Sequence, residues 1–290
     1  MDATRHILKH VAIVTHPKLT GAVPLAETIA KQFEEHGIKT SFGFLYNEDI
    51  HRQAKAGAFN LLIALGGDGT MLRAGHLTGP CNLPILGINL GHFGFLMELG
   101  RDEWNAFFPR LIAGDYWLER RMMLCAEQWR GGEKHGSWDV LNEVVISRGQ
   151  TVRPIHLITK VDGRFLTTYV ADALIVSTPT GSTAYALAAG GPILPPELRN
   201  ILMVAVAPHL SLDRPIILAE GATVTINVKT DHQAVFSVDG QVPIGMSEDD
   251  RIEVRAGEHT VLFVRFHDPG YFYRNLTQHM NHNPASGGSQ

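Results

Sequence analysis

Residues 60–88 read NLLIALGGDGTMLRAGHLTGPCNLPILGI, and this stretch carries the pattern that determines the class of fold. Its apolar runs at 60–65 and 83–88 are short, continuous and bounded by turn residues, which is typical of buried strands. Between them lie the glycine-rich turn GGDG and a segment that predicts a helix beginning near Thr70. A strand, a helix and a second strand in this order predict part of a parallel α/β layer.

The residues before this stretch repeat the same alternation. Residues 10–15 (HVAIVT) predict a buried strand, and Pro24 opens a helix that Gly37 closes. The apolar residues of this helix recur at the spacing of one helical face; they are Leu25, Ile29 and Phe33. We therefore expect a parallel, Rossmann-like α/β domain at the N-terminus.

The periodicity of the apolar residues changes after about residue 100. Residues 101–114 carry an apolar stripe typical of a helix packed on a core, made by Trp104, Phe107, Phe108, Leu111 and Ile112. From about Tyr116, period-two alternation dominates, which indicates half-buried strands. Asp162-Gly163 predicts a type I′ hairpin turn, because both residues readily take positive φ. A β-rich, antiparallel and sandwich-like domain is expected to follow the first domain.

The composition sets bounds on function. The 290 residues are 44% hydrophobic, enough for at least one full core, and the net charge of −4 comes without any dense basic run. This argues against a broad basic face for nucleic acid or for an anionic membrane. Cys81 and Cys125 lack metal or disulfide spacing, so we expect two small buried side chains in a reducing compartment. The N-terminus predicts neither a signal peptide nor a membrane span, and a cytoplasmic location is expected.

The turn Gly66-Gly67-Asp68-Gly69 directly follows the strand at 60–65. Glycines in such a turn let the backbone approach a phosphate or a sugar and point free N–H groups at it. Asp68 has two interpretations: it caps the helix that follows, or it takes part in catalysis. The motif by itself indicates phosphoryl transfer at most, because phosphofructokinases and lipid kinases share it.

Two further polar stretches are candidates for ligand binding. Residues 177–192 (STPTGSTAYALAAGGP) follow an apolar strand, and their hydroxyls and glycines can offer a phosphate or a ribose many hydrogen bonds without net charge. Asn142 and Glu143 stand at the head of a strand, and their side chains suit a ribose or an adenine edge. Taken alone, a polar pair at the start of a strand is more often an ordinary edge feature.

In this order and spacing, the motifs resemble those of the NAD kinase family. The resemblance covers nearly the whole chain and includes GINLGHFGFL at 87–96, NEVVI at 142–146 and SVDGQ at 237–241. It implies transfer of the terminal phosphate of ATP, or of polyphosphate, to the 2′-hydroxyl of the adenosine ribose of NAD, giving NADP. It also implies NAD and ATP as substrates and a homodimer or homotetramer.

The resemblance assigns residues position by position. Asp68 matches the catalytic aspartate, which contacts the 2′-hydroxyl and accepts its proton; an Asp of ordinary pKa, about 4, suffices because the transition state is loose. Phe95 matches an aromatic near the adenine, although spacing alone favours a core position. The other matched residues bind NAD or ATP: Gly66, Gly67, Gly69, Asn142, Glu143, Asp172, Thr180, Thr183, Ala184, Tyr185, Ala188, Ala207, Asp239 and Gln241.

Three assignments carry an alternative. Arg73 and Arg153 are candidates for phosphate contacts by charge and position, although exposed arginines are usually just solvated. Asp239 begins the same Asp-Gly dipeptide as the hairpin at 162–163, and only the family pattern places it in the site. Ala173 follows Asp172 where the family usually has glycine, so its methyl group either crowds the ligand or only fixes the backbone.

No metal site built from the protein alone is expected. The chain has no HExxH or Walker-type motif, and the pair His279 and His282 lies in the polar tail. A divalent ion, Mg²⁺ or Mn²⁺, should instead arrive with ATP, and no tightly bound prosthetic group is implied.

We expect an α/β domain over 1–100, a β-rich NAD-binding domain over 101–262, a segment at 263–280 that returns to the first domain, and a disordered tail at 281–290. The site is expected in the cleft between the two domains. Two alternatives stay open: a diacylglycerol-type or sphingoid lipid kinase that also uses GGDG, and a non-catalytic NAD(P) sensor that keeps the pocket without turnover.

Overall fold

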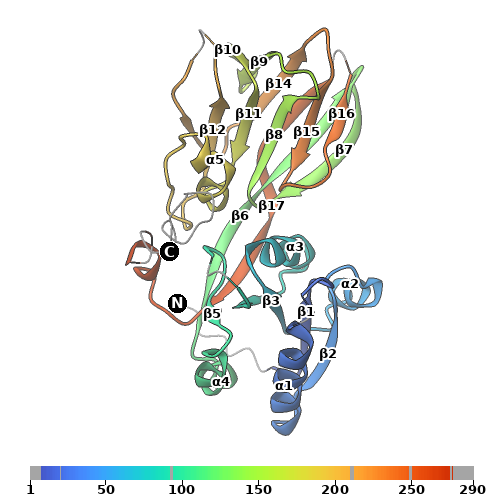
Figure 1. The fold of residues 1–290 in the computed structure, drawn as a ribbon, viewed down its shortest axis with the longest axis vertical. Coiled ribbons are helices and arrows are strands. Elements are labelled where there is room, and N and C mark those ends of the chain that lie inside the picture. The colour runs from blue at the N-terminus through green and yellow to red at the C-terminus, as the bar shows by residue number, and fades with distance from the viewer. Residues whose placement is uncertain are drawn as a thin grey trace. The chain divides into compact units, whose positions relative to one another are not determined.

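The computed structural model describes residues 8–19, 21–91, 94–209, 212–247, 250–274 and 276. The chain forms two compact units: residues 1–120 with 261–290, and residues 121–260 (Figure 1). It passes into unit 2 within strand β6 (Trp117–Arg130) and returns to unit 1 within strand β17 (Arg251–Arg265). The expected return of the C-terminal segment to the first unit is therefore confirmed. The tail at 281–290 lies outside the described residues.

Unit 1 is an α/β layer in which strands and helices alternate, as the sequence predicts. Its strand pairings β1–β2, β1–β3, β3–β4, β4–β5 and β4–β17 are all parallel, in the order β17-β4-β3-β1-β2 with β5 beside β4. The elements are β1 (His10–Thr15), α1 (Ala22–Glu35), β2 (Lys39–Phe44), α2 (Glu48–Lys55), β3 (Leu61–Gly66), α3 (Asp68–Thr78), the 3₁₀ turn η1 (Gly79–Cys81), β4 (Ile85–Asn89), β5 (Leu99–Gly100) and α4 (Trp104–Ala113).

A hydrophobic core packs helices of unit 1 against its sheet. Every residue of β3 is buried, which explains its continuous apolar run. The apolar faces of α1 and α4 join the same cluster, with Ile29 and Phe33 on α1 and Phe108 on α4. Each such side chain contributes about 1.5–3 kcal/mol when buried. Because α4 packs here, unit 1 extends past Gly100, where the period of the sequence changes.

Unit 2 is an antiparallel β-sandwich. One sheet has the order β13-β12-β11-β8-β15-β16, and the other contains β10-β9-β14-β17 and the pair β6–β7. Their facing apolar side chains form a single core cluster. The remaining elements are β7 (Glu133–Val140), β8 (Glu143–Arg148), β9 (Ile155–Val161), β10 (Arg164–Ala171), β11 (Ala173–Ser177), η2 (Thr180–Thr183), α5 (Tyr185–Ala188), β12 (Asn200–Val206), β13 (Ile216–Ala219), β14 (Val224–Lys229), β15 (Ala234–Val238) and β16 (Ile244–Met246).

The predicted hairpin between β9 and β10 is confirmed. Val161 pairs with Arg164, and the two turn residues Asp162 and Gly163 have φ of 52° and 75°. The Asp162 carboxylate accepts a hydrogen bond from Thr223 N at 2.9 Å, which joins the turn to the start of β14.

Two expectations about the surface can be compared with the structure. Cys81 and Cys125 are free thiols, but both are partly exposed, so the expectation that they are buried is wrong. Cys125 lies on β6, where its Sγ is 3.4 Å from Ser137 Oγ on the neighbouring strand. Within the described ranges, no helix has the length and apolar character needed to cross a membrane.

Candidate functional site

The glycine-rich turn of unit 1 leads directly from β3 into α3. Gly66 packs so closely on the helix that a Cβ there would lie 2.1 Å from Thr70 Oγ1. Gly67 is the N-cap, and Asp68 is the first helical residue, earlier than the start predicted near Thr70. Because Gly67 occupies the N-cap position, the interpretation of Asp68 as the N-cap residue is wrong. A carboxylate in the first turn still interacts favourably with the helix dipole.

The Asp68 carboxylate is held by the segment that follows β4. Its Oδ2 accepts a hydrogen bond from Phe95 N at 2.9 Å, and its Oδ1 accepts one from Leu96 N at 3.0 Å. Only glycine fits at position 94, because a Cβ there would lie 2.2 Å from Asp68 Oδ1. The Asp68 side chain is only partly buried, so solvent and small molecules can approach it.

Phe95 and Arg73 lie on the surface of the same unit. The Phe95 ring is partly exposed and stands 6.4 Å from the Phe272 ring, so the core position favoured by its spacing is wrong. Arg73 is exposed, and its guanidinium lies 5.9 Å from the centroid of the Tyr46 ring. Unit 1 thus brings together Asp68, Phe95 and the three glycines of the turn.

In unit 2, the turn after β11 is docked against the start of β8. Thr178 N donates to Asn142 O at 2.9 Å, and Thr178 Oγ1 donates to Leu141 O at 2.6 Å. Gly181 must be glycine, since a Cβ there would lie 2.3 Å from Asn142 O. The turn is thereby joined to Asn142, one of the two residues predicted to hold a ribose.

Several hydroxyls of this turn bind the protein itself, in contrast to the expectation that they would face a ligand. Ser182 Oγ donates to Pro179 O at 2.7 Å and accepts from Leu194 N at 2.9 Å. Ser177 Oγ donates to Asn142 O at 3.0 Å. Thr180 is buried, and its Oγ1 accepts from Arg121 Nη1 at 3.3 Å. Buried hydroxyls need a partner, and here the backbone supplies most of them.

Downstream of these hydroxyls, the turn becomes more accessible. Thr183 is partly buried, and its Oγ1 donates to Thr180 O at 3.2 Å. Ala184 is partly exposed, Tyr185 is 43% exposed and Ala188 is exposed. These three side chains are therefore the part of the stretch that a ligand can reach most easily.

Asp239 braces the start of β8. Its carboxylate accepts backbone hydrogen bonds from Leu141 at 2.7 Å, Asn142 at 2.7 Å and Glu143 at 2.9 Å. Asp239 N donates in return to Glu143 O at 2.9 Å. Asp239 and Gly240 have φ of 48° and 65°, the turn geometry also seen at Asp162, but the Asp239 side chain is only 8% exposed.

Glu143 is a buried carboxyl group with unusual properties. It is 7% exposed, and burial together with the charge of Asp239 raises its pKa to about 8. Among the described residues, neither its Oε2 nor the buried Oδ1 of Asn142 has a hydrogen-bond partner. Leaving buried polar atoms unpaired is costly, so two of them on adjacent residues indicate a place where a polar ligand binds.

Asp172 and Ala207 flank the other end of β11. Asp172 Oδ1 pairs with Arg148 Nε at 3.0 Å, and Asp172 N donates to Val206 O at 3.1 Å. Ala207 has a φ of 47°, which is uncommon for a residue other than glycine. Ala173 lies in the extended backbone of β11 and is buried, so no positive φ requires glycine there.

The predicted site residues thus fall into two groups, one in each unit. Arg153 and Gln241 are exposed in unit 2, and the backbone of Gln241 accepts a hydrogen bond from Ser237 Oγ at 2.8 Å. The expected cleft between the domains stays a prediction. In the part of the chain that the structure describes, no cluster of three or more His, Cys, Asp or Glu side chains could hold a metal ion.

Sequence reasoning missed two residues that shape these groups. Gly94 lies within the motif GINLGHFGFL without any feature that marks it, yet it is the glycine against which the Asp68 carboxylate packs. Thr178 was one hydroxyl among many, yet it also accepts from Gly181 N at 3.1 Å and so closes the turn. No local pattern distinguishes either residue, because their partners lie on other elements.

Comparison with known families gives matches over most of the chain. The model described as ATP-NAD kinase N-terminal domain matches residues 25–116, and the ATP-NAD kinase C-terminal domain matches residues 141–266. The NAD kinase of Chloroflexus aurantiacus (strain J-10-fl) is 39% identical over 272 residues, which are 93% of this chain and 98% of the relative. The NAD kinase of Geotalea daltonii is 41% identical over 226 residues, 78% of each.

Two solved structures share the fold. Yeast NADH kinase complexed with NADH superposes with a TM-score of 0.82 at 24% identity, covering 95% of this chain and 88% of the yeast chain. An NAD kinase from Archaeoglobus fulgidus in complex with ATP gives a TM-score of 0.75 at 23% identity, covering 94% and 99%. At these identities the likeness concerns the fold, an α/β unit followed by a β-sandwich.

Proposed function

Because the chain belongs to the NAD kinase family, we propose which of its residues bind the substrates and which take part in the family's reaction. The enzyme transfers the terminal phosphate of ATP to the 2′-hydroxyl of the adenosine ribose of NAD and so produces NADP and ADP. The lipid kinase and the non-catalytic sensor receive no support from these relatives.

We propose that Asp68 orients the 2′-hydroxyl and takes its proton late in the transfer. The observation that carries this role is the carboxylate at the start of α3, which two backbone N–H groups hold in place. In a loose transition state the attacking hydroxyl needs positioning more than early ionisation, which a fixed carboxylate provides.

We propose that Asn142 and Glu143 bind ribose hydroxyls of NAD. Their unpaired atoms, Asn142 Oδ1 and Glu143 Oε2, can both accept a hydrogen bond. With a pKa of about 8, Glu143 is protonated at neutral pH and can also donate one. A neutral carboxyl group suits a site that must also admit the negatively charged phosphates of the dinucleotide.

The remaining contacts are proposals of the same kind. The backbone of Gly66, Gly67 and Gly69 and the cations Arg73 and Arg153 would meet phosphates, and Phe95 would stack near the adenine. NAD and ATP as substrates agree with the ligands named for the yeast and Archaeoglobus structures. The other proposed binding residues are Asp172, Thr180, Thr183, Ala184, Tyr185, Ala188, Ala207 and Gln241, with Asp239 acting as the brace described above.

A divalent ion, Mg²⁺ or Mn²⁺, would come with the phosphates of ATP. The described residues offer single carboxylates such as Asp68 rather than a cage of three ligands, which fits an ion held mainly by phosphate and water. When bound, the ion neutralises developing charge on the transferred group. We also propose a cytoplasmic homodimer or homotetramer, to be checked by fractionation and by light scattering.

The test is NADP formation by the purified full chain with NAD, Mg²⁺ and ATP, beside Asp68→Asn. We expect the variant to lose kcat by at least about 100-fold while the Kd for NAD stays close to wild type, since proton acceptance contributes roughly 10²–10⁴-fold. A parallel reaction with polyphosphate identifies the donor. An Asp68→Asn enzyme with wild-type kcat would remove Asp68 from the mechanism, and a folded wild-type enzyme without NADP formation would contradict the assigned reaction.

A further inference from the structure

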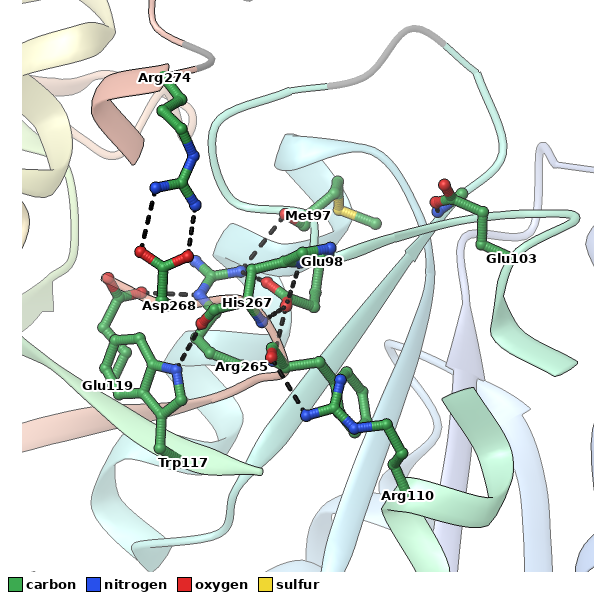
Figure 2. A network of polar contacts seen from close by, with 12 residues as sticks. Met97, Glu98, Glu103, Arg110, Trp117, Glu119, Arg265, His267, Asp268 and Arg274 are labelled. Atoms are coloured by element: carbon green, nitrogen blue, oxygen red, sulfur yellow. Dashed lines mark hydrogen bonds and ion pairs between the residues drawn. The ribbon is translucent and has the colours of Figure 1, made fainter. Parts of the chain in front are cut away.

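A buried charge network in unit 1 lies next to the segment that holds Asp68, and the reaction described above does not use it. Its members are Glu98, Glu119 and Arg265, which are 2%, 8% and 7% exposed. Figure 2 shows the three side chains converging, together with His267 and the carbonyl oxygen of Met97. Charges are rarely buried unless they are paired, so the network needs an explanation.

Arg265 is the centre of this network. Its Nε donates to Glu119 Oε2 at 2.8 Å, while its Nη1 donates to Glu98 Oε2 at 3.0 Å and to the backbone oxygens of Leu96 and Met97 at 3.3 Å each. Burial by itself lowers the pKa of Arg265, but Glu119 and Glu98 outweigh that effect and raise it. The guanidinium is therefore always charged.

Leu96 connects this network to Asp68. Its N–H donates to Asp68 Oδ1 at 3.0 Å, and its C=O accepts from Arg265. Glu98 joins the same segment to the residues that follow β17. Its Oε1 accepts hydrogen bonds from Phe266 N at 2.7 Å and from His267 Nδ1 at 2.9 Å (Figure 2). Leu96 thus donates to the carboxylate through its N–H, while its carbonyl and that of Met97 are held by Arg265 at the end of β17.

We propose that Arg265 is a positioning residue for phosphoryl transfer: by holding the carbonyls of Leu96 and Met97, it places the N–H groups that hold the Asp68 carboxylate. This inference rests on the proposed role of Asp68. A guanidinium is required, because its planar fork reaches Glu119 with one nitrogen and the 96–98 segment with another, which the single ammonium of lysine does not do.

The test compares Arg265→Lys with two control variants of the full-length enzyme. Arg110→Met and Trp117→Phe each remove one hydrogen bond to the same C-terminal segment, from Arg110 Nη2 to Phe266 O at 3.3 Å and from Trp117 Nε1 to His267 O at 2.6 Å. Neither bond reaches the segment 94–97. We expect kcat of Arg265→Lys to fall roughly 10- to 100-fold, with KM for NAD and ATP within about twofold, because small displacements of a catalytic group cost rates of this size. Both controls should keep kcat.

Two further measurements separate positioning from general stability. Amide hydrogen exchange should become faster at Phe95 and Leu96 in Arg265→Lys but not in the controls. In the Asp68→Asn background, Arg265→Lys should cause no further loss of kcat, since the carboxylate it positions is gone.

The outcomes are distinguishable. If Asp68→Asn alone keeps kcat, the proposed role of Asp68 fails and this inference fails with it. If Asp68→Asn loses activity but Arg265→Lys keeps wild-type kcat, or lowers it equally in both backgrounds, only the inference is overturned. Should Arg265→Lys not fold, Glu119→Gln replaces it in the comparison with the Asp68→Asn background. This change removes the charge that attracts Arg265 Nε but leaves an amide oxygen that can still accept its hydrogen bond.

Discussion

At the scale of single residues, the space around a glycine decides whether a side chain could be added there. Gly94 lies against the Asp68 carboxylate, whereas Gly91, a few residues earlier, has open space where a Cβ would be. The two glycines therefore form a matched pair for asking whether close approach to Asp68 matters.

Gly94→Ala should displace the Asp68 carboxylate, because the added Cβ would lie 2.2 Å from its Oδ1. We expect kcat to fall by roughly tenfold or more, on the argument that catalytic groups tolerate little displacement. Gly91→Ala should keep kcat within about twofold, because a substitution on the surface that contacts no functional group usually has a small effect. Steady-state kinetics on both variants check this, and equal activity of the two would contradict the proposed contact.

Glu143 makes stability depend on pH. Its pKa is about 8 in the folded chain against an ordinary value of 4.5, so the folded state holds the proton more tightly. The stabilising contribution is complete below about pH 4.5 and is lost as pH rises through 8. Glu143→Gln carries no such proton, so relative to wild type its free energy of unfolding should increase by on the order of a few kcal/mol between pH 5 and 8.5.

Urea unfolding of the ligand-free proteins at these two values of pH measures the difference. Parallel pH dependence in wild type and Glu143→Gln would show that Glu143 is already ionised at neutral pH. The proposed hydrogen-bond donation to NAD would then be withdrawn.

At the scale of elements, the two Asp-Gly turns have the same backbone geometry and different tasks. The turn at 162–163 closes an exposed hairpin, and its carboxylate receives one hydrogen bond, from Thr223 N. The turn at 239–240 lies beside β8, and its carboxylate receives three. Turn propensity is therefore equal at both places, and only the neighbouring strand gives the Asp239 carboxylate its backbone partners at residues 141–143.

Asp239→Asn should weaken the start of β8 much more than Asp162→Asn weakens the hairpin. The amide that replaces the carboxylate has one acceptor oxygen, so at least one buried N–H is left unpaired, at a cost of about 1–3 kcal/mol. The loss of negative charge should also lower the pKa of Glu143. Chemical unfolding of both variants checks the first expectation, and carboxyl titration by NMR checks the second; equal destabilisation would mean that the brace contributes nothing.

At the scale of the whole molecule, the chain leaves unit 1 and later returns to it. The returning residues Val261 and Phe263 are fully buried, and Phe263 pairs with Ile85 of β4. Unit 1 is therefore incomplete until the last part of the chain has been added.

Removal of residues 261–290 should prevent unit 1 from folding, because it deletes a strand of the sheet together with Arg265 and exposes the edge of β4. Removal of 281–290 alone should leave the Tm and NADP formation unchanged, because the sequence NHNPASGGSQ offers no large apolar side chain to a core. Limited proteolysis and thermal unfolding compare the two. A cooperative transition of unit 1 without residues 261–290 would show that the return is dispensable.

Local patterns in the sequence predict the class of fold, several of its strands and helices, and the family. Alternation of strands and helices, the hairpin at 162–163 and the motifs at Asp68 and Glu143 are local patterns, set by side-chain periodicity and turn chemistry within a few residues. For the same reason, the helix ends and strand ends agree closely with expectation, and α3 begins only slightly early, at Asp68.

Only the tertiary structure decided what the functional groups touch. The partners of the Asp68 carboxylate are 27 and 28 residues away, those of Asp239 are 96 to 98 away, and the carbonyls held by Arg265 are 168 and 169 away. The hydroxyls of Ser177 and Thr178 likewise bind backbone oxygens 35 and 37 residues away. Hydrogen bonds depend on distance in space, and separations this large leave no mark on local periodicity, so packing alone determines them.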